Sequence, residues 1–105
     1  MTQTNKQKIT SITFKPKAYC YCPLGDDWYT NELEIYIGVG DLFPDYCDIE
    51  KYLNEEIRGK SLIIEDVIAK VYEYIETTYK PLYLSVSSHI QDAISHSEVY
   101  VTKES

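Results

Sequence analysis

The most regular segment of the chain reads Trp28-Tyr-Thr-Asn-Glu-Leu-Glu-Ile-Tyr-Ile-Gly-Val39. Apolar residues stand at every second position from Leu33 to Val39, and Glu32, Glu34 and Tyr36 alternate with them. Successive side chains of a strand point to opposite faces, so this alternation predicts a long strand with one buried face.

An extended pattern also covers residues 9–22, where Pro16 interrupts the alternation and indicates an edge strand or a bulge. The residues between this segment and the long strand read Cys22-Pro-Leu-Gly-Asp-Asp27, and proline, glycine and aspartate each favour a turn. We therefore expect the two segments to pair as a hairpin.

Helical spacing follows the loop 40–44. Apolar residues recur every three or four positions in 45–57, which predicts a short helix that stops near Gly59. Ser61 is placed to cap a second helix that runs to about Thr78, with its buried stripe between Ile64 and Ile75. Alternation resumes in 82–87 and 97–102, and we expect 89–95 to be a connection.

The predicted fold class is α+β: a four-stranded antiparallel sheet with two consecutive helices on one face. The order strand, strand, helix, helix, strand, strand buries every apolar stripe in this arrangement. Residues 1–8 read as a flexible polar leader, and 9–105 as a single domain. The open sheet edges favour pairing with further copies in a homo-oligomer.

The net charge of the chain limits the classes of partner that it is expected to bind. Ten Lys and Arg against seventeen Asp and Glu give a net charge of −7 over 105 residues, which argues against binding nucleic acid or an anionic membrane surface. No apolar run has the length of a membrane span, and the polar start lacks the pattern of a signal peptide. Three cysteines favour a reduced, cytoplasmic protein over a disulfide scaffold.

These segments together resemble the tunnelling fold, or T-fold, whose members handle purines and pterins. Three stretches carry the resemblance: Asp45-Tyr-Cys-Asp-Ile-Glu-Lys-Tyr-Leu53, Ser61-Leu-Ile-Ile-Glu-Asp-Val-Ile-Ala-Lys-Val71 and Lys80-Pro-Leu-Tyr-Leu-Ser-Val86. The resemblance implies that the sheets join into a barrel by oligomerisation, with small-molecule sites between subunits. It also implies that Glu65, in the first helical turn, anchors a heterocycle through its paired N–H groups.

One branch of this superfamily acts on the nitrile of 7-cyano-7-deazaguanine (preQ0), in queuosine-type metabolism. Tyr21-Cys-Pro-Leu-Gly25 is similar to its catalytic turn, which implies that Cys22 attacks the nitrile and that Asp27, or else Asp26, moves the proton. The reductases of this branch use NADPH through a lysine-containing segment that reads Asp45-Tyr-Cys-Asp48 here. The missing lysine leaves nitrile binding as the expectation and NADPH as an open alternative.

A second branch, dihydroneopterin aldolase of folate metabolism, is also similar. Tyr46-Cys-Asp-Ile49 matches a segment that supplies a tyrosine to the pterin ring, and Ile63-Ile-Glu-Asp-Val-Ile68 matches its anchoring helix. The branch relies on a lysine after the third strand, where this chain reads Ser87-Ser-His89. His89 is a further candidate to line the pocket, and its alternative is a satisfied loop histidine.

Metal binding is the weakest of these readings. Cys20, Cys22, Cys47, His89 and His96 are zinc-ligand types, but a C-x-C pair with distant histidines is a poor spacing signal, so we expect no metal. The function expected from the sequence is an enzyme acting on a purine- or pterin-like ring. The alternative from another class is a non-catalytic ligand-binding or assembly subunit.

Overall fold

The computed structural model describes residues 9–92 and 97–105, so the expected leader 1–8 and His96 lie outside the described residues. Within these ranges, no helix is both long enough and apolar enough to cross a membrane. The elements along the chain are β1 (Ser11–Phe14), β2 (Lys17–Cys22), β3 (Asp27–Gly38), α2 (Tyr46–Glu56), α3 (Ile64–Tyr79), β4 (Tyr83–Asp92) and β5 (Ser97–Glu104).

The strands form one antiparallel sheet with the order β1-β3-β4-β5, and β2 pairs with β3 on the same side as β1. Pro16 separates β1 from β2, because proline has no N–H for the ladder. Its carbonyl still accepts the Leu33 N–H at 2.9 Å, so the two short strands continue along one edge of β3. The expected sheet is confirmed, with its first strand in two pieces.

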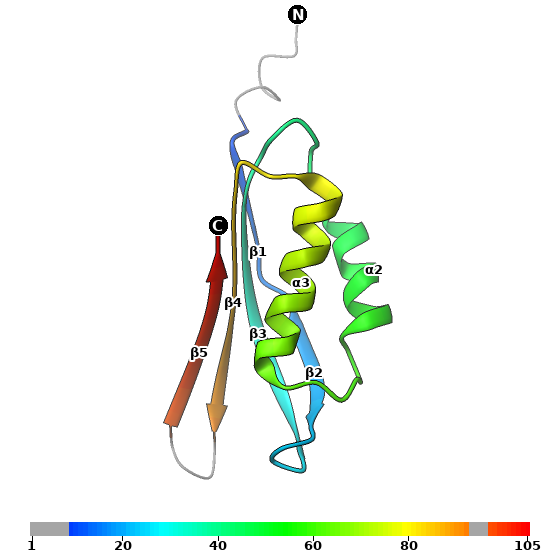
Figure 1. Ribbon diagram of the computed structural model, residues 1–105, viewed down its shortest axis with the longest axis vertical. Helices are drawn as coiled ribbons and strands as arrows, with labels where there is room; N and C mark the ends of the chain where they lie inside the picture. The colour runs from blue at the N-terminus through cyan, green and yellow to red at the C-terminus, as the bar shows by residue number, and fades with distance from the viewer. Residues whose placement is uncertain (1–8, 93–96) are drawn as a thin grey trace, which may run out of the picture.

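Both helices lie side by side on one face of the sheet (Figure 1). The buried stripe of α3 packs on the sheet residues predicted from the alternation, and the fully buried side chains include Ile35, Ile37, Leu84, Val71 and Ile75. Burying one such side chain stabilises the fold by ~1.5–3 kcal/mol. This common core holds both helices against the sheet.

The helix starts differ from each other. Asp45 caps α2, because its side chain accepts N–H groups of Cys47 and Asp48. The prediction that Ser61 caps the second helix is wrong: α3 begins at Ile64, and no side chain caps its N-cap residue Ile63. Ser61 instead forms an isolated parallel bridge with Tyr21, so its backbone is used for strand pairing.

The second hairpin also differs from the prediction. The expected connection from His89 onward is wrong, because β4 continues to Asp92 and pairs His89 with both Glu32 of β3 and Tyr100 of β5. Serines have little strand preference of their own, but Ser88 is buried and its hydroxyl donates to Asn31 Oδ1 at 2.8 Å. Long-range pairing thus lengthens the strand beyond its local signal.

Candidate functional site

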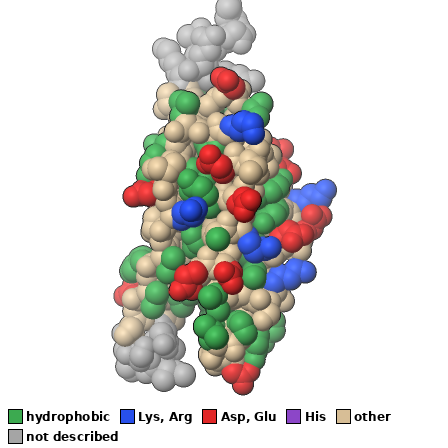
Figure 2. All heavy atoms as spheres, in the orientation of Figure 1, with side chains coloured by type: hydrophobic (Ala, Val, Ile, Leu, Met, Phe, Trp, Pro, Cys, Tyr) green, Lys and Arg blue, Asp and Glu red, His purple; other side chains and the backbone are tan. Residues whose placement is uncertain are grey.

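A cavity of about 700 Å³ opens where the two hairpins separate. The pairing of β3 with β4 ends at Glu32 and His89. Two positions further along the same register, Thr30 and Gln91 would face each other, but both of these residues line the cavity instead. Figure 2 shows the molecule hollowed at this end. The start of α3 contributes Ile63, Ile64 and Glu65 to the lining.

Cys22 is the last residue of β2 and is partly buried in the cavity wall. The turn that follows directs the Gly25 N–H at its sulfur, with the nitrogen 3.4 Å from Sγ. An N–H aimed at sulfur stabilises negative charge there. All three cysteines are free, and among the described residues Cys22 alone of the three lines this cavity.

Two aspartates close the same turn, and the structure separates them. Asp27 pairs with Cys22 in the hairpin register, lines the cavity and accepts the Trp28 N–H at 2.8 Å. Asp26 has a φ of 53° and accepts a hydrogen bond from the Tyr21 hydroxyl outside the cavity lining. Of the two candidates for the acid, the geometry favours Asp27.

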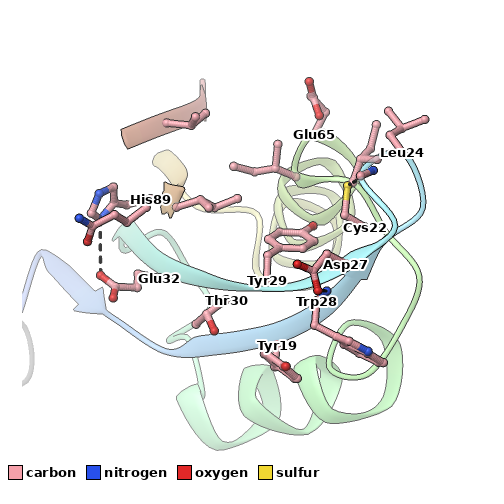
Figure 3. Close-up of a pocket in the computed structure, with 16 residues that line it drawn as sticks. Tyr19, Cys22, Leu24, Asp27, Trp28, Tyr29, Thr30, Glu32, Glu65 and His89 are labelled. Carbon is pink, nitrogen blue, oxygen red and sulfur yellow. Dashed lines mark hydrogen bonds and ion pairs between the residues drawn. The ribbon is translucent and has the colours of Figure 1, made fainter. Parts of the chain in front are cut away.

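Glu65 stands in the first turn of α3 and lines the cavity. Its side chain is exposed, and Figure 3 shows the carboxylate pointing away from Cys22 and from the sheet. In the described part of the chain this carboxylate forms no ion pair. A ring held by Glu65 would therefore lie at the rim of the cavity.

His89 lines the opposite wall and is held by two carboxylates. Its Nδ1 lies 3.5 Å from Glu32 Oε1, and its Nε2 lies 2.8 Å from Glu98 Oε1 (Figure 3 marks the first contact). The ring also stacks on Tyr100, with centroids 4.4 Å apart. A ligand that bonds to either nitrogen of His89 must replace one of these contacts.

Tyr46 is not brought to this cavity within one chain. It begins α2, is 59% exposed, and its ring centroid lies 6.0 Å from that of Phe14. A role for Tyr46 beside Glu65 would therefore require a second copy of the chain.

Tyr29, which was not among the residues expected from the sequence, also lines the cavity. Its hydroxyl donates to the Leu62 carbonyl at 2.5 Å. Burial, together with smaller contributions from negative charge on Cys20, Cys22 and Glu65, raises the pKa of this hydroxyl to about 12. Once the hairpin register is known, its two-residue spacing from Asp27 places it on the same strand face, which was the available signal.

An aromatic pair on the other face of the strands was likewise not expected from the sequence. Tyr19 and Trp28 stack with centroids 5.1 Å apart, and both side chains are exposed. Figure 3 shows them on the opposite side of β2 and β3 from Cys22 and Tyr29. The aromatic pair therefore borders the cavity without contacting the candidate nucleophile.

The residues present do not fit a nicotinamide dinucleotide at the segment 45–48. Asp45 accepts the first N–H groups of α2, where a phosphate would otherwise bind, and Asp48 accepts bonds from two tyrosine hydroxyls. Both carboxylates would repel a phosphate. For metals, the described residues contain no group of three or more His, Cys, Asp or Glu side chains arranged to bind one.

Among the comparisons with known proteins, only those with solved structures give matches. No protein-family model and no curated protein matches the sequence. The structure of an archaeosine synthase QueF-Like protein in the apo form superposes with a TM-score of 0.83 at 17% identity, over 93% of this chain and 95% of that one. A protein from Vibrio cholerae assigned as dihydroneopterin aldolase (FolB) gives 0.74 at 16% identity, over 93% and 98%. The chain therefore has the tunnelling fold.

Proposed function

We propose that the protein is an enzyme that binds a purine- or pterin-like ring and adds Cys22 to the nitrile of a 7-cyano-7-deazaguanine-type substrate. One observation carries the proposal: Cys22 of β2, Asp27 of β3 and Glu65 of α3 line one cavity. The similarity of the Cys22-Pro-Leu-Gly25 turn to the nitrile-acting branch supports it.

Glu65 is the proposed anchor of the ring. A guanine-like edge offers two parallel N–H donors, and a carboxylate accepts both in charge-assisted bonds. The carboxylate is exposed at the cavity rim, so a ligand can reach it without breaking an ion pair described here. The N-terminal end of α3 adds a favourable field for negative charge at this position.

The proposed chemical step is the addition of S–H across the nitrile. The Cys22 thiol gives its proton to the Asp27 carboxylate, and the sulfur forms a bond to the nitrile carbon. One carbon–nitrogen π bond breaks, its electron pair moves to nitrogen, and Asp27 returns the proton there. The product is a thioimide; no group leaves, and nothing is oxidised or reduced. An amine or ammonia could then displace the thiol and yield an amidine.

The proposed assembly is a homo-oligomer that completes the site. The outer edge of β2 is covered by its own chain, because Tyr19 and Tyr21 bond to the backbone of residues 59–62. In the described part of the chain, β1 and β5 each pair on one side only, so these edges can join a second copy. Light scattering should give a particle mass of at least two chains of 12.2 kDa each. The mass of a single chain would contradict a site shared between subunits.

The test of the chemistry is intact-mass spectrometry after incubation with preQ0. The expected mass gain equals one whole substrate molecule per chain, because the addition releases nothing. Cys22→Ala should abolish the gain. Cys47→Ser is the matched control, since Cys47 is a free, exposed cysteine that does not line the cavity. An unchanged mass together with an unchanged melting temperature would rule out the nitrile proposal.

A further variant, Cys22→Ser, separates the alternatives. In a pterin enzyme of the aldolase type, Glu65 and Tyr46 would hold the ring and Cys22 would be structural, so Cys22→Ser would keep binding and turnover. In a nitrile enzyme, Cys22→Ser would keep binding and lose the adduct. A non-catalytic subunit would bind a ring, or another copy, with no dependence on Cys22.

A further inference from the structure

The segment that leads into α3 is held by contacts outside the helix. α3 begins at Ile64, and no side chain caps its N-cap residue Ile63. A missing cap weakens the first turn of a helix by ~1 kcal/mol. The position of Glu65, one residue into this helix, therefore depends on what holds the residues just before it.

The backbone of β2 holds one side of this segment. The Tyr21 N–H donates to the Lys60 carbonyl at 2.9 Å, and the Leu62 N–H donates to the Tyr21 carbonyl at 2.9 Å. Tyr21 directly precedes Cys22, so these two bonds tie the approach to Glu65 to the strand that carries the proposed nucleophile. Neither bond uses the Leu62 carbonyl, which can therefore accept a hydrogen bond from another residue.

Tyr29 provides that second contact. Its hydroxyl donates to the Leu62 carbonyl at 2.5 Å, across 33 residues of sequence. The ring packs partly buried against the core, and Figure 3 shows it on the same side of the strands as Cys22. Because burial raises the pKa of this hydroxyl to about 12, it remains a donor at every ordinary pH.

We infer that Tyr29 is a positioning residue: its hydroxyl fixes Leu62 and so holds Glu65 at the distance from Cys22 that one bound ring requires. The inference rests on the proposed function, in which Glu65 anchors the ring and Cys22 reacts with it. Tyr29 acts through Leu62 and the first turn of α3.

The role predicts a specific pattern of losses. Without the hydroxyl, the Leu62 carbonyl loses its side-chain donor while the two bonds to Tyr21 remain. The first turn of α3 then samples more positions, and ring binding weakens because ordering Glu65 costs entropy. The Cys22 thiol keeps its strand and its contact with the Gly25 N–H, so its reactivity with small reagents stays the same.

The test compares Tyr29→Phe with Tyr52→Phe. The Tyr52 hydroxyl also donates to a backbone carbonyl, that of Lys70 at 3.3 Å, but Tyr52 does not line the cavity. Calorimetry with preQ0 should give an affinity five- to tenfold lower for Tyr29→Phe and unchanged for Tyr52→Phe. Alkylation of Cys22 by iodoacetamide, measured in a Cys47→Ser background, should proceed at the same rate in all forms.

A double-mutant cycle shows whether Tyr29 acts through Glu65. In the Glu65→Gln background, Tyr29→Phe should cause no further loss of affinity, because the anchor is already impaired. Fully additive losses, or an affinity unchanged by Tyr29→Phe alone, would overturn the inference.

Hydrogen exchange gives a readout that does not need a ligand. The Leu62 amide should exchange faster in Tyr29→Phe than in the wild type or in Tyr52→Phe. If the wild type binds no preQ0, the proposed function fails, and equal Leu62 exchange in the three proteins would overturn the tether as well. If the wild type binds preQ0 but the losses of affinity from Tyr29→Phe and Glu65→Gln are additive, the positioning role fails and the proposed function stands.

Discussion

Asp48 in the first turn of α2 and Glu65 in the first turn of α3 have opposite surroundings. Asp48 in α2 accepts the hydroxyls of Tyr74 and Tyr79 at 2.6 and 2.7 Å. Glu65 in α3 is exposed at a cavity and forms no ion pair among the described residues. The protein itself supplies hydrogen-bond donors to the Asp48 carboxylate, whereas the Glu65 carboxylate is exposed.

The difference extends to the helix starts themselves. α2 has a side-chain cap from Asp45, whereas α3 has none and is held by contacts of the segment before it. The Asp48 cluster joins α2 to α3, so its bonds contribute to the stability of the fold. We therefore expect changes at Asp48 to alter stability and changes at Glu65 to alter ligand binding.

The largest expected effect is on stability, from Asp48→Ala. The substitution leaves the Tyr74 hydroxyl without its acceptor and the Tyr79 hydroxyl with only the Asp45 carbonyl at 3.4 Å, so it should lower the free energy of unfolding by ~1–2 kcal/mol. Urea denaturation measures this, with Glu55→Ala as the control because Glu55 is an exposed acid of the same helix. Unchanged stability, or a lost affinity for preQ0, would contradict the structural role of Asp48.

Glu65→Gln should give the reverse result. The amide keeps the size of the side chain but accepts at one oxygen only, so affinity for preQ0 should fall about tenfold, or ~1.4 kcal/mol. The free energy of unfolding should change by less than ~0.5 kcal/mol, since the side chain is exposed. Asp66→Asn, the next exposed acid in the same turn, is the matched control. Equal losses in both variants would mean a general charge effect.

The order of elements could be predicted because each element repeats its own period. Alternation in Leu33–Val39 and helical spacing in Ile64–Ile75 are local signals, and the core packs on the residues they identify. The start of α3 and the length of β4 could not be predicted, because both depend on distant backbones. Ser61 pairs with Tyr21, and His89 pairs with Glu32 and Tyr100.

The residues of the candidate site could be predicted where they belong to a recognisable sequence motif. Cys22, Asp27 and Glu65 were named from a resemblance, and the structure places them around one cavity, while their roles stay predictions. Tyr29 could not be predicted, because its hydroxyl donates to a carbonyl 33 residues away and such a hydrogen bond leaves no pattern in the sequence. For Tyr46, no pattern in one chain says whether a second copy brings it to the ring.

Acid sensitivity should also follow Asp48. Hydrogen bonds from Tyr74 and Tyr79 lower the pKa of its carboxyl below the usual 3.8, so the folded state binds this proton less readily than the unfolded state. The contribution to stability is complete above pH 3.8 and is lost as pH falls through the lowered value. Urea midpoints measured down this range should fall less steeply in Asp48→Asn. Parallel curves would contradict the prediction.

The smallest effect concerns Tyr29 and Tyr79, whose pKa is raised mainly by burial. Burial is the main cause of a pKa of about 12 at both Tyr29 and Tyr79, but the bond to Asp48 adds to it only at Tyr79. Asp48→Ala should therefore lower the pKa of Tyr79 and leave that of Tyr29 unchanged. Tyrosinate absorbance after a rapid pH jump, before unfolding, measures this when the wild type is compared with Tyr79→Phe, and Asp48→Ala with Asp48→Ala/Tyr79→Phe. The difference within each pair isolates Tyr79, and the two differences together give its shift. A shifted Tyr29 step would mean that the two regions are coupled through α3, and Glu65 would then respond to changes at Asp48 as well.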